Sequence, residues 1–229
     1  IETYVLANGT NSITLSSTAG QNVTGNAGAD ALILNNSTTY SGTLALAAGT
    51  NVVNMVNGSN LGTATLTATG GTINFAIASS ASVTMKEADH TLLAAGTTTA
   101  AGLQTLIISN GGTIAVQSVI ETYAGSAGNN TTFTLGTHAA VNITGNSGIE
   151  TLTLDGSTAY SGNLVLAAGT NVVTMVNGSN LGSATLTASG GTIDFTIASG
   201  ASVTMSLAQN DLLVAGTVTA AGTELITLA

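Results

Sequence analysis

Basic side chains are almost absent from this sequence of 229 residues. Lys86 is the only lysine and there is no arginine, whereas ten aspartates and glutamates give a formal net charge of −9. Proteins that bind nucleic acids or anionic membranes use lysine and arginine to neutralise phosphate groups. We therefore expect no nucleic-acid partner, and the same shortage argues against an enzyme that handles phosphorylated substrates.

Cysteine, proline and tryptophan are missing altogether. Without cysteine the chain has no disulfide bonds and no thiolate ligands for a metal. Hydrophobic residues make up 44% of the sequence, which is too high for a disordered chain. No apolar run approaches the length of a membrane span, so we expect no insertion into a membrane. The composition is that of a folded, acidic protein, and we expect it to be extracellular or on the cell surface.

What the sequence does contain is a long internal repeat. Residues 40–85 return at 160–205 with eight differences among 46 positions, and IETY at 1–4 returns at 120–123. We therefore predict two repeat units, 1–119 and 120–229, the second being a truncated copy stacked continuously on the first. The second copy stops partway through a repeat, at the counterpart of Ser109. That pattern is expected of a window on a longer array.

Short segments with alternating apolar and polar residues run through each unit and end at glycine, asparagine or serine. Such segments predict β-strands joined by turns. Apolar pairs recur at a spacing of about 20 residues, namely Leu32/Leu34, Val53/Met55, Ile73/Phe75 and Leu92/Leu93. This spacing predicts an all-β fold, a parallel β-helix (β-solenoid) with coils of about 20 residues and at least two strands per coil.

Tandem Ig-like β-sandwiches are the alternative fold, because strands at roughly 8–12-residue intervals fit them too. A sandwich core needs large side chains, but aromatic residues make up only 3% of this chain. The narrow core of a solenoid needs alanine, valine, leucine and threonine, which are abundant here. A helical turn is expected only within MKEADHTLLAAG (85–96).

One glycine-rich stretch is close to a calcium-binding motif. Read from Gly25, the residues GNAGADALI differ by one substitution from the nonapeptide GGxGxDxUx, in which U is a large apolar residue. The second copy has Glu150 where Asp30 stands, and no acidic residue occurs in the 18 positions after Asp30. One such motif supplies few of the six or more oxygens that calcium takes. The other interpretation is a turn in which Asn26 or Asp30 caps its own backbone.

The segments GIETL (148–152), VIETY (119–123) and GTELI (222–226), together with GNAGAD, resemble bacterial surface-layer and RTX-type secreted proteins. The resemblance implies export and assembly into sheets, fibres or adhesive coats. It also implies calcium as the one cofactor, although none is otherwise required. Its ligand set would be the carboxylate of Asp30 and the turn residues Gly25, Asn26 and Gly28, with Glu150 at the matching place in the second copy.

Candidate catalytic residues do not form a recognisable set. Asn210 stands at the position that matches His90, and His138 is also unmatched, so we expect both histidines to be solvent-exposed. A glycosidase needs two carboxyl groups in a cleft, and solenoid enzymes of that class line the groove with aromatic and basic residues that are missing here. No G-x-S-x-G elbow accompanies a histidine and an acid. We expect no enzymatic activity.

Threonine alternation in TATLTAT (63–69) is typical of the flat threonine ladders of ice-binding solenoids. Such ladders need the same T-x-T on many consecutive coils, and this pattern occurs once per unit. We therefore expect no such ladder in this chain.

The sequence as a whole predicts a structural, self-assembling module of an exported surface-layer or fibrous protein. A solenoid leaves open strand edges at both ends, and this chain has no proline and little charge with which to block them. Copies of the chain are therefore the expected partners, through head-to-tail or lateral contacts. The alternative is a binding module, either an adhesin stalk or a calcium-dependent ligand binder.

Overall fold

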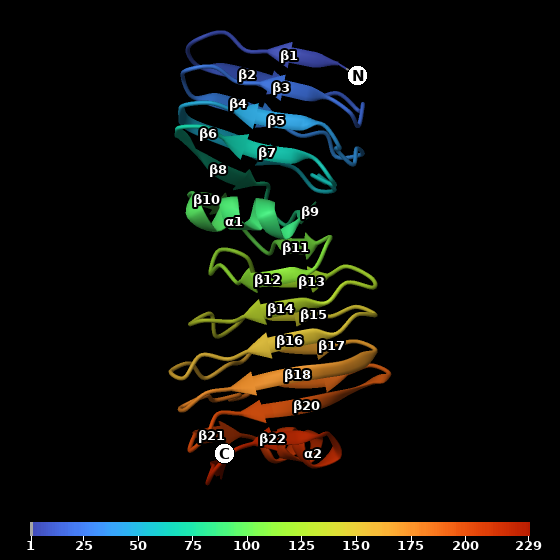
Figure 1. The fold of residues 1–229 in the computed structure, drawn as a ribbon, viewed down its shortest axis with the longest axis vertical. Coiled ribbons are helices and arrows are strands. Elements are labelled where there is room, and N and C mark those ends of the chain that lie inside the picture. Colours follow the sequence, from blue (N-terminus) through green and yellow to red (C-terminus); the bar gives the residue numbers. More distant parts are fainter. Residues whose placement is uncertain (1) are drawn as a thin grey trace. The chain divides into compact units, whose positions relative to one another are not determined.

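The computed structural model describes residues 2–229 and shows a β-solenoid in which the strands of successive coils pair in parallel (Figure 1). The predicted parallel β-helix is therefore confirmed. The Ig-like alternative is wrong, because sandwiches of that kind are built from antiparallel sheets. The chain divides into two units, Ile1–Ser109 and Asn110–Ala229. The repeat boundary at 119/120 and the continuous stacking of one unit on the other stay predictions.

Unit 1 contains two sheets and a pair of strands. The first sheet consists of β1 (Thr3–Val5), β3 (Asn22–Thr24), β5 (Thr43–Leu46) and β7 (Thr65–Ala68). The second consists of β2 (Asn11–Thr14), β4 (Asp30–Ile33), β6 (Gly49–Met55), β8 (Gly71–Ile77) and β10 (Thr98–Ala100). The pair is β9 (Ser82–Met85) with β11 (Thr105–Ile108). The helix α1 (Glu87–Ala95) connects β9 to β10.

Unit 2 repeats this arrangement. Its first sheet consists of β13 (Thr122–Gly125), β15 (Asn142–Thr144), β17 (Asn163–Leu166) and β19 (Thr185–Ala188). Its second consists of β12 (Gly112–Ala115), β14 (Thr131–Thr134), β16 (Glu150–Thr153), β18 (Gly169–Met175), β20 (Gly191–Ile197) and β22 (Val218–Ala220). The pair is β21 (Ser202–Met205) with β23 (Leu225–Leu228), and α2 (Leu207–Ala215) follows β21.

The coils lengthen along each unit. In unit 1, paired residues lie 19 positions apart at Thr3↔Asn22, 21 at Val23↔Leu44, 22 at Thr43↔Thr65 and 23 at Ser82↔Thr105. Unit 2 shows the same series at Thr131↔Glu150, Ile143↔Leu164, Asn163↔Thr185 and Ser202↔Leu225. The predicted coil of about 20 residues is therefore slightly short. The added residues lie in the corners, because the strands themselves remain paired residue for residue.

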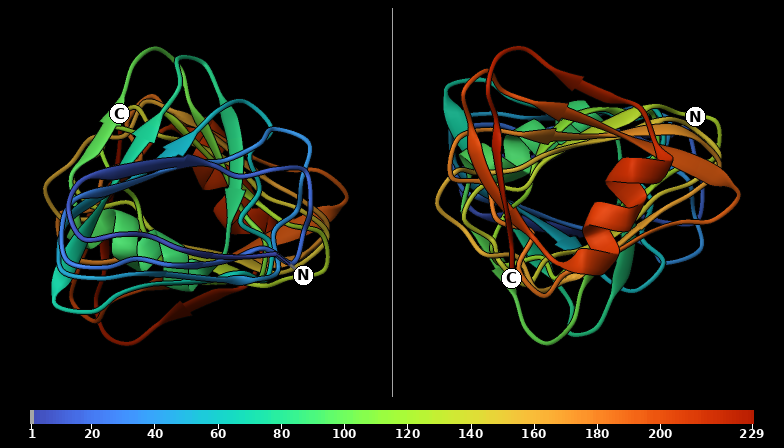
Figure 2. Two further views of the ribbon diagram at one scale, coloured as in Figure 1. Left: turned by 90° about the horizontal axis from the view of Figure 1, so that it is seen from above. Right: turned by 90° about the horizontal axis from the view of Figure 1, so that it is seen from below.

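Alternation along each strand separates an apolar interior from the surface. In unit 1, Leu32, Val53 and Phe75 are register partners on successive coils, and each is at most 1% exposed. Their chain neighbours point the other way, because successive side chains of a strand lie on opposite faces. Burying each such side chain contributes about 1.5–3 kcal/mol. Seen end-on, the strands of each unit wind around this interior (Figure 2).

The segment predicted to hold a helical turn forms the helix α1, so Leu92/Leu93 are not a strand pair. The start of α1 is anchored to the residue before β7, where Lys86 Nζ donates a hydrogen bond to the Ala64 carbonyl. Its end lies against β8, where a Cβ on Gly96 would meet the Ile73 carbonyl oxygen at 1.9 Å. The helix therefore packs against β8, with its start anchored beside the residue that precedes β7.

Gly28 occupies a corner that only glycine fits. Its φ is +137°, and a Cβ there would lie 2.1 Å from the carbonyl oxygen of Gly9. Gly70 provides a control, because its φ is +74° but a Cβ there would have open space.

We expect Gly70→Ala to cost roughly 1–2 kcal/mol, from backbone strain alone. Gly28→Ala should cost at least about 3 kcal/mol, because strain and overlap add. Urea unfolding of both variants measures this, and equal losses of free energy would contradict the role assigned to the Gly9–Gly28 contact.

Candidate functional site

A polar column runs along one inner corner of unit 1. Asp30, at the start of β4, is 1% exposed, and Asn51 on the next coil is fully buried. Asp30 Oδ1 accepts a hydrogen bond of 2.7 Å from Asn11 Nδ2, and the Asp30 backbone N–H donates one of 3.0 Å to Asn51 Oδ1. Asn51 Nδ2 in turn donates to the Ala47 carbonyl at 3.0 Å. These bonds link three consecutive coils from inside, as buried polar groups require.

The residues proposed from the calcium motif meet in the turn before β4. A Cβ on Gly25 would lie 2.8 Å from Asp30 Oδ2 and 3.0 Å from the Ala47 backbone nitrogen. Asn26 Oδ1 accepts a hydrogen bond from the Ala27 backbone N–H in the same turn. Gly28 provides the corner described above. Four of the five predicted site residues are therefore neighbours in one turn, and Glu150 occupies the matching turn of unit 2.

The groups around Asp30 suit a hydrogen-bond acceptor better than a calcium ligand. The side-chain contact of Oδ1 is the amide donor of Asn11, and Oδ2 is buried without a hydrogen bond. Calcium takes six to eight oxygen ligands. Within residues 2–229, no three His, Cys, Asp or Glu side chains are grouped so that they could hold a metal ion. Calcium at Asp30 and Glu150 stays a prediction, and the geometry favours the capped turn.

Glu150 takes the same place in unit 2 with one more methylene. It is fully buried, its Oε1 accepts a hydrogen bond of 3.1 Å from the Asn146 backbone N–H, and its own N–H donates to Asn171 Oδ1 at 3.0 Å. A Cβ on Gly145 would lie 2.7 Å from Oε2, so glycine makes room for the longer side chain. Burial raises the pKa of Glu150, and the backbone N–H groups of Asn146 and Ala167 oppose that rise.

A second group of buried polar side chains lies on the inner side of α1 itself. Asp89 is 1% exposed and His90 is 3% exposed, so the expectation that His90 is solvent-exposed is wrong. Burial raises the pKa of Asp89 to about 6, against the opposing charge and backbone N–H of Lys86. Burial also lowers the pKa of His90 to about 4. His138 is half-buried, and its Nε2 lies 3.2 Å from the Ile120 carbonyl oxygen.

Unit 2 has different residues at the positions of this buried polar group. Ser206 and Gln209, the counterparts of Lys86 and Asp89, form a capping box at the start of α2. Gln209 Nε2 also donates a hydrogen bond of 2.7 Å to the Ala184 carbonyl. In unit 1, Lys86 makes the equivalent bond to Ala64. The differences between the matched positions were visible in the sequence, but they did not reveal that these side chains are buried.

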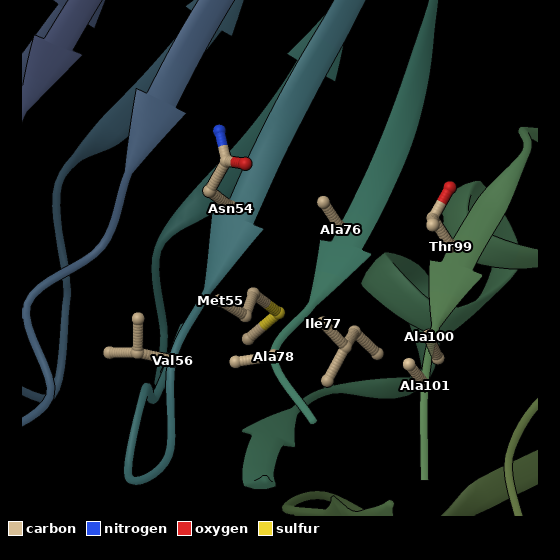
Figure 3. A pocket seen from close by; sticks show the side chains of 9 residues that line it. All are labelled: Asn54, Met55, Val56, Ala76, Ile77, Ala78, Thr99, Ala100 and Ala101. Carbon is tan, nitrogen blue, oxygen red and sulfur yellow. The ribbon is translucent and has the colours of Figure 1, made fainter. Parts of the chain in front are cut away.

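A groove of about 250 Å³ lies where β6, β8 and β10 end in unit 1 (Figure 3). Its lining is mostly apolar and includes no acid, base or histidine: Asn54, Met55, Val56, Ala76, Ile77, Ala78, Thr99, Ala100 and Ala101. Two smaller pockets lie at matching places between each helix and its sheet, beside Ile73 and Leu92 in unit 1 and beside Ile193 and Leu212 in unit 2. None of these pockets brings together groups for acid–base or nucleophilic chemistry.

Replacing Glu150 with glutamine tests the charge in the polar column. Because the folded pKa of Glu150 is raised, its contribution to stability is present below the unfolded value of 4.5 and is lost as the pH rises. Glu150→Gln should therefore be more stable than the wild type at pH 7, by roughly 1 kcal/mol, and should lose that advantage near pH 4. Urea unfolding at several pH values measures the difference, and a pH-independent difference would contradict the assignment.

Asp89 and His90 should give opposite pH dependences. Asp89 contributes fully to the free energy of unfolding below about pH 3.8, and this contribution is lost as the pH rises through about 6. His90 contributes fully above about pH 6.5, and its contribution is lost as the pH falls through about 4. Asp89→Gln leaves the histidine, so its free energy of unfolding should fall between pH 6.5 and pH 4. His90→Asn leaves the acid, so its free energy of unfolding should fall between pH 4 and pH 6.

Both substitutions place the residue of unit 2 at the matching position, which keeps them compatible with the fold. Unfolding curves at four pH values are enough to separate the two slopes. If both variants retained the profile of the wild type, the two groups would not titrate as their burial requires.

Similarity to known proteins does not identify a function for this chain. Among residues 2–229, no helix is long and apolar enough to cross a membrane. No protein-family model matches the chain, and no curated protein and no solved structure is significantly similar to it.

Proposed function

We propose that this chain is a structural module of an exported cell-surface or fibrous protein and that it assembles with copies of itself. The observation that carries this proposal is the parallel register that repeats from coil to coil, because a further copy of the chain could pair with it in the same way. Leu225 is 63% exposed and Leu228 is 53% exposed, although the counterpart of Leu228 in unit 1, Ile108, is fully buried. The same strand position is therefore compatible with complete burial.

The strands β1, β2, β22 and β23 of the described residues have a partner on one side only. Within the described residues, β22 pairs with β20 and β23 pairs with β21, and neither has a partner on its other side. The strands β1 and β2 likewise pair on one side only, with β3 and β4. Proteins block such edges with charge, proline or a covering helix. Here the helices pack against β8 and β20, and the open strands carry no proline or lysine.

The helix of unit 2 also presents more apolar surface than its counterpart. Leu207 is 65% exposed and stands where unit 1 has Glu87, and Val214 is 74% exposed and stands where unit 1 has Ala94. Exposed apolar groups that adjoin an open edge are typical of an interaction surface. The shortage of lysine and arginine leaves few sites for trypsin-like proteases, which supports an exposed, extracellular location. The resemblance to surface-layer proteins agrees with this proposal.

Leu225→Lys places a charge on the open edge and tests the proposal. The wild type should form filaments or sheets in electron micrographs, and Leu225→Lys should shift the population toward single chains, because a buried lysine would need a partner. Leu103→Lys is the matched control, since Leu103 is 74% exposed but lies in a loop. It should assemble as the wild type does.

The same specimens examined in calcium and after chelation with EGTA test the cofactor. Assembly in both buffers makes GNAGAD a structural turn, whereas assembly that dissolves on chelation makes Asp30 and its neighbours a calcium switch. Single chains of the wild type in both buffers would overturn the proposed self-assembly and favour an adhesin stalk.

A further inference from the structure

The outer face of the second sheet of unit 2 carries a column of threonines. The register pairs Thr134 with Thr153, Thr153 with Thr174, Thr174 with Thr196, and Thr196 with Thr219. Five consecutive strands therefore present threonine at one position. A second column runs beside it two residues away, through Thr113, Thr132 and Thr151. We call these eight residues the threonine face.

The threonine face lies on the outer side of a sheet whose inner side is packed in the core. The strands β14 and β16 alternate buried and half-buried residues, and their threonines at 132, 134, 151 and 153 take the half-buried positions. Between them, Phe133 and Leu152 are fully buried in the core. Thr219 on the last strand is exposed. The inner side of the same sheet is therefore packed while the outer side meets solvent.

The register does not produce the T-x-T ladder discussed for TATLTAT, because only β14 and β16 carry threonine at both positions. It produces one column of threonines over five strands, from TTFT (131–134), ETLT (150–153) and strands in which one of the two positions is threonine. Coils of 19, 21, 22 and 23 residues bring these segments into register, so a search at a fixed period misses them.

Unit 1 lacks this feature on the corresponding face. Its column reads Thr14, Ile33, Asn54, Ala76 and Thr99. Three of the eight differences between residues 40–85 and 160–205 fall on this face, at the positions of Thr174, Asp194 and Thr196. Two of those three introduce threonine. The two units therefore share a fold and a core while presenting different chemistry on one face.

A regular array of threonines is matched to a regular array of water. Each side chain carries one methyl and one hydroxyl group, and branching at Cβ restricts its χ1 rotamer. In-register strands repeat these groups about every 4.8 Å across the sheet, and on β14 and β16 a second threonine lies roughly 6.7 Å away along the strand. Such an array holds water in repeating positions without ordering flexible side chains on binding, which is the general advantage of a preorganised surface.

We infer that the threonine face binds the surface of ice crystals. Its chemistry separates this ligand from a polysaccharide, because sugar-binding surfaces use aromatic side chains and this face has none. It also separates ice from an ionic ligand. Asp194 and Asp155 are the charged residues beside the column, and both carboxylates are used within the chain. Asp194 Oδ1 accepts a hydrogen bond of 2.8 Å from the Thr217 backbone N–H, and Asp155 Oδ1 accepts one of 2.6 Å from the Ser157 backbone N–H. The inference does not depend on the proposed self-assembly, since one unit supplies the whole face.

Partition into growing ice tests the inference directly. Ice is grown slowly from a dilute solution of the full chain, and the protein concentration is compared between the ice and the remaining liquid. The wild type should be enriched in the ice. Thr153→Ile, Thr174→Asn and Thr196→Ala, combined in one chain, should abolish that enrichment, because they place the residues of unit 1 in the column.

Asn163→Thr with Val165→Ala is the matched control. It also places residues of unit 1 in unit 2, but on the other sheet, and it should partition as the wild type does. Circular dichroism confirms that both variants are folded. The inference is overturned if the wild type stays in the liquid, if the two variants lose enrichment equally, or if the triple variant keeps it. Retention on insoluble cellulose without enrichment in ice would also overturn it, in favour of a polysaccharide ligand.

Discussion

The parallel hydrogen-bonded register between consecutive coils is the constraint on which the rest of this structure depends. Because each strand pairs residue for residue with the next, every position along a strand becomes a column through several coils. A column is a stack of side chains spaced at about 4.8 Å. Whatever chemistry one coil places at a position must therefore tolerate the same position on the coils above and below it.

The polar corner shows how such a column accommodates an acid. An asparagine both donates and accepts, so Asn51 can join the coils on either side of it. A carboxylate only accepts, and Asp30 is therefore placed where Asn11 supplies a side-chain donor. In unit 2 the carboxylate of Glu150 reaches backbone N–H groups instead. Glycines at 25 and 145 leave the space that each acid fills. The geometry around the motif that resembles a calcium loop favours a buried acceptor with its glycine, and calcium there stays a prediction.

Spacing and alternation predicted the fold and most of the core, but not the columns on the surface. Leu32 stacks on Val53 as predicted, but Val53 and Met55 stack on Phe75 and Ile77. The predicted pair 73/75 therefore lies two residues early, because the coil is longer than about 20 residues. Threonine is common in this chain on all faces, so alignment requires the exact length of every corner. The burial of His90 could not be predicted for a different reason. Polar residues flank His90 in the sequence, and only the geometry of the helix α1 places it on the buried side together with Leu93.

The comparison of the two units shows where this architecture is free to change. None of the eight differences between residues 40–85 and 160–205 falls on a buried residue. The core columns are identical because a change in size on one coil would open a cavity or a clash against its neighbours. Residues of the outer columns do not fill the interior, so they can differ between the units without opening a cavity in the core. A solenoid therefore separates the residues that determine its shape from those that determine what it binds. The threonine face is such a rewritten column, since its backing residues Val173 and Phe195 are the same as Val53 and Phe75 in unit 1.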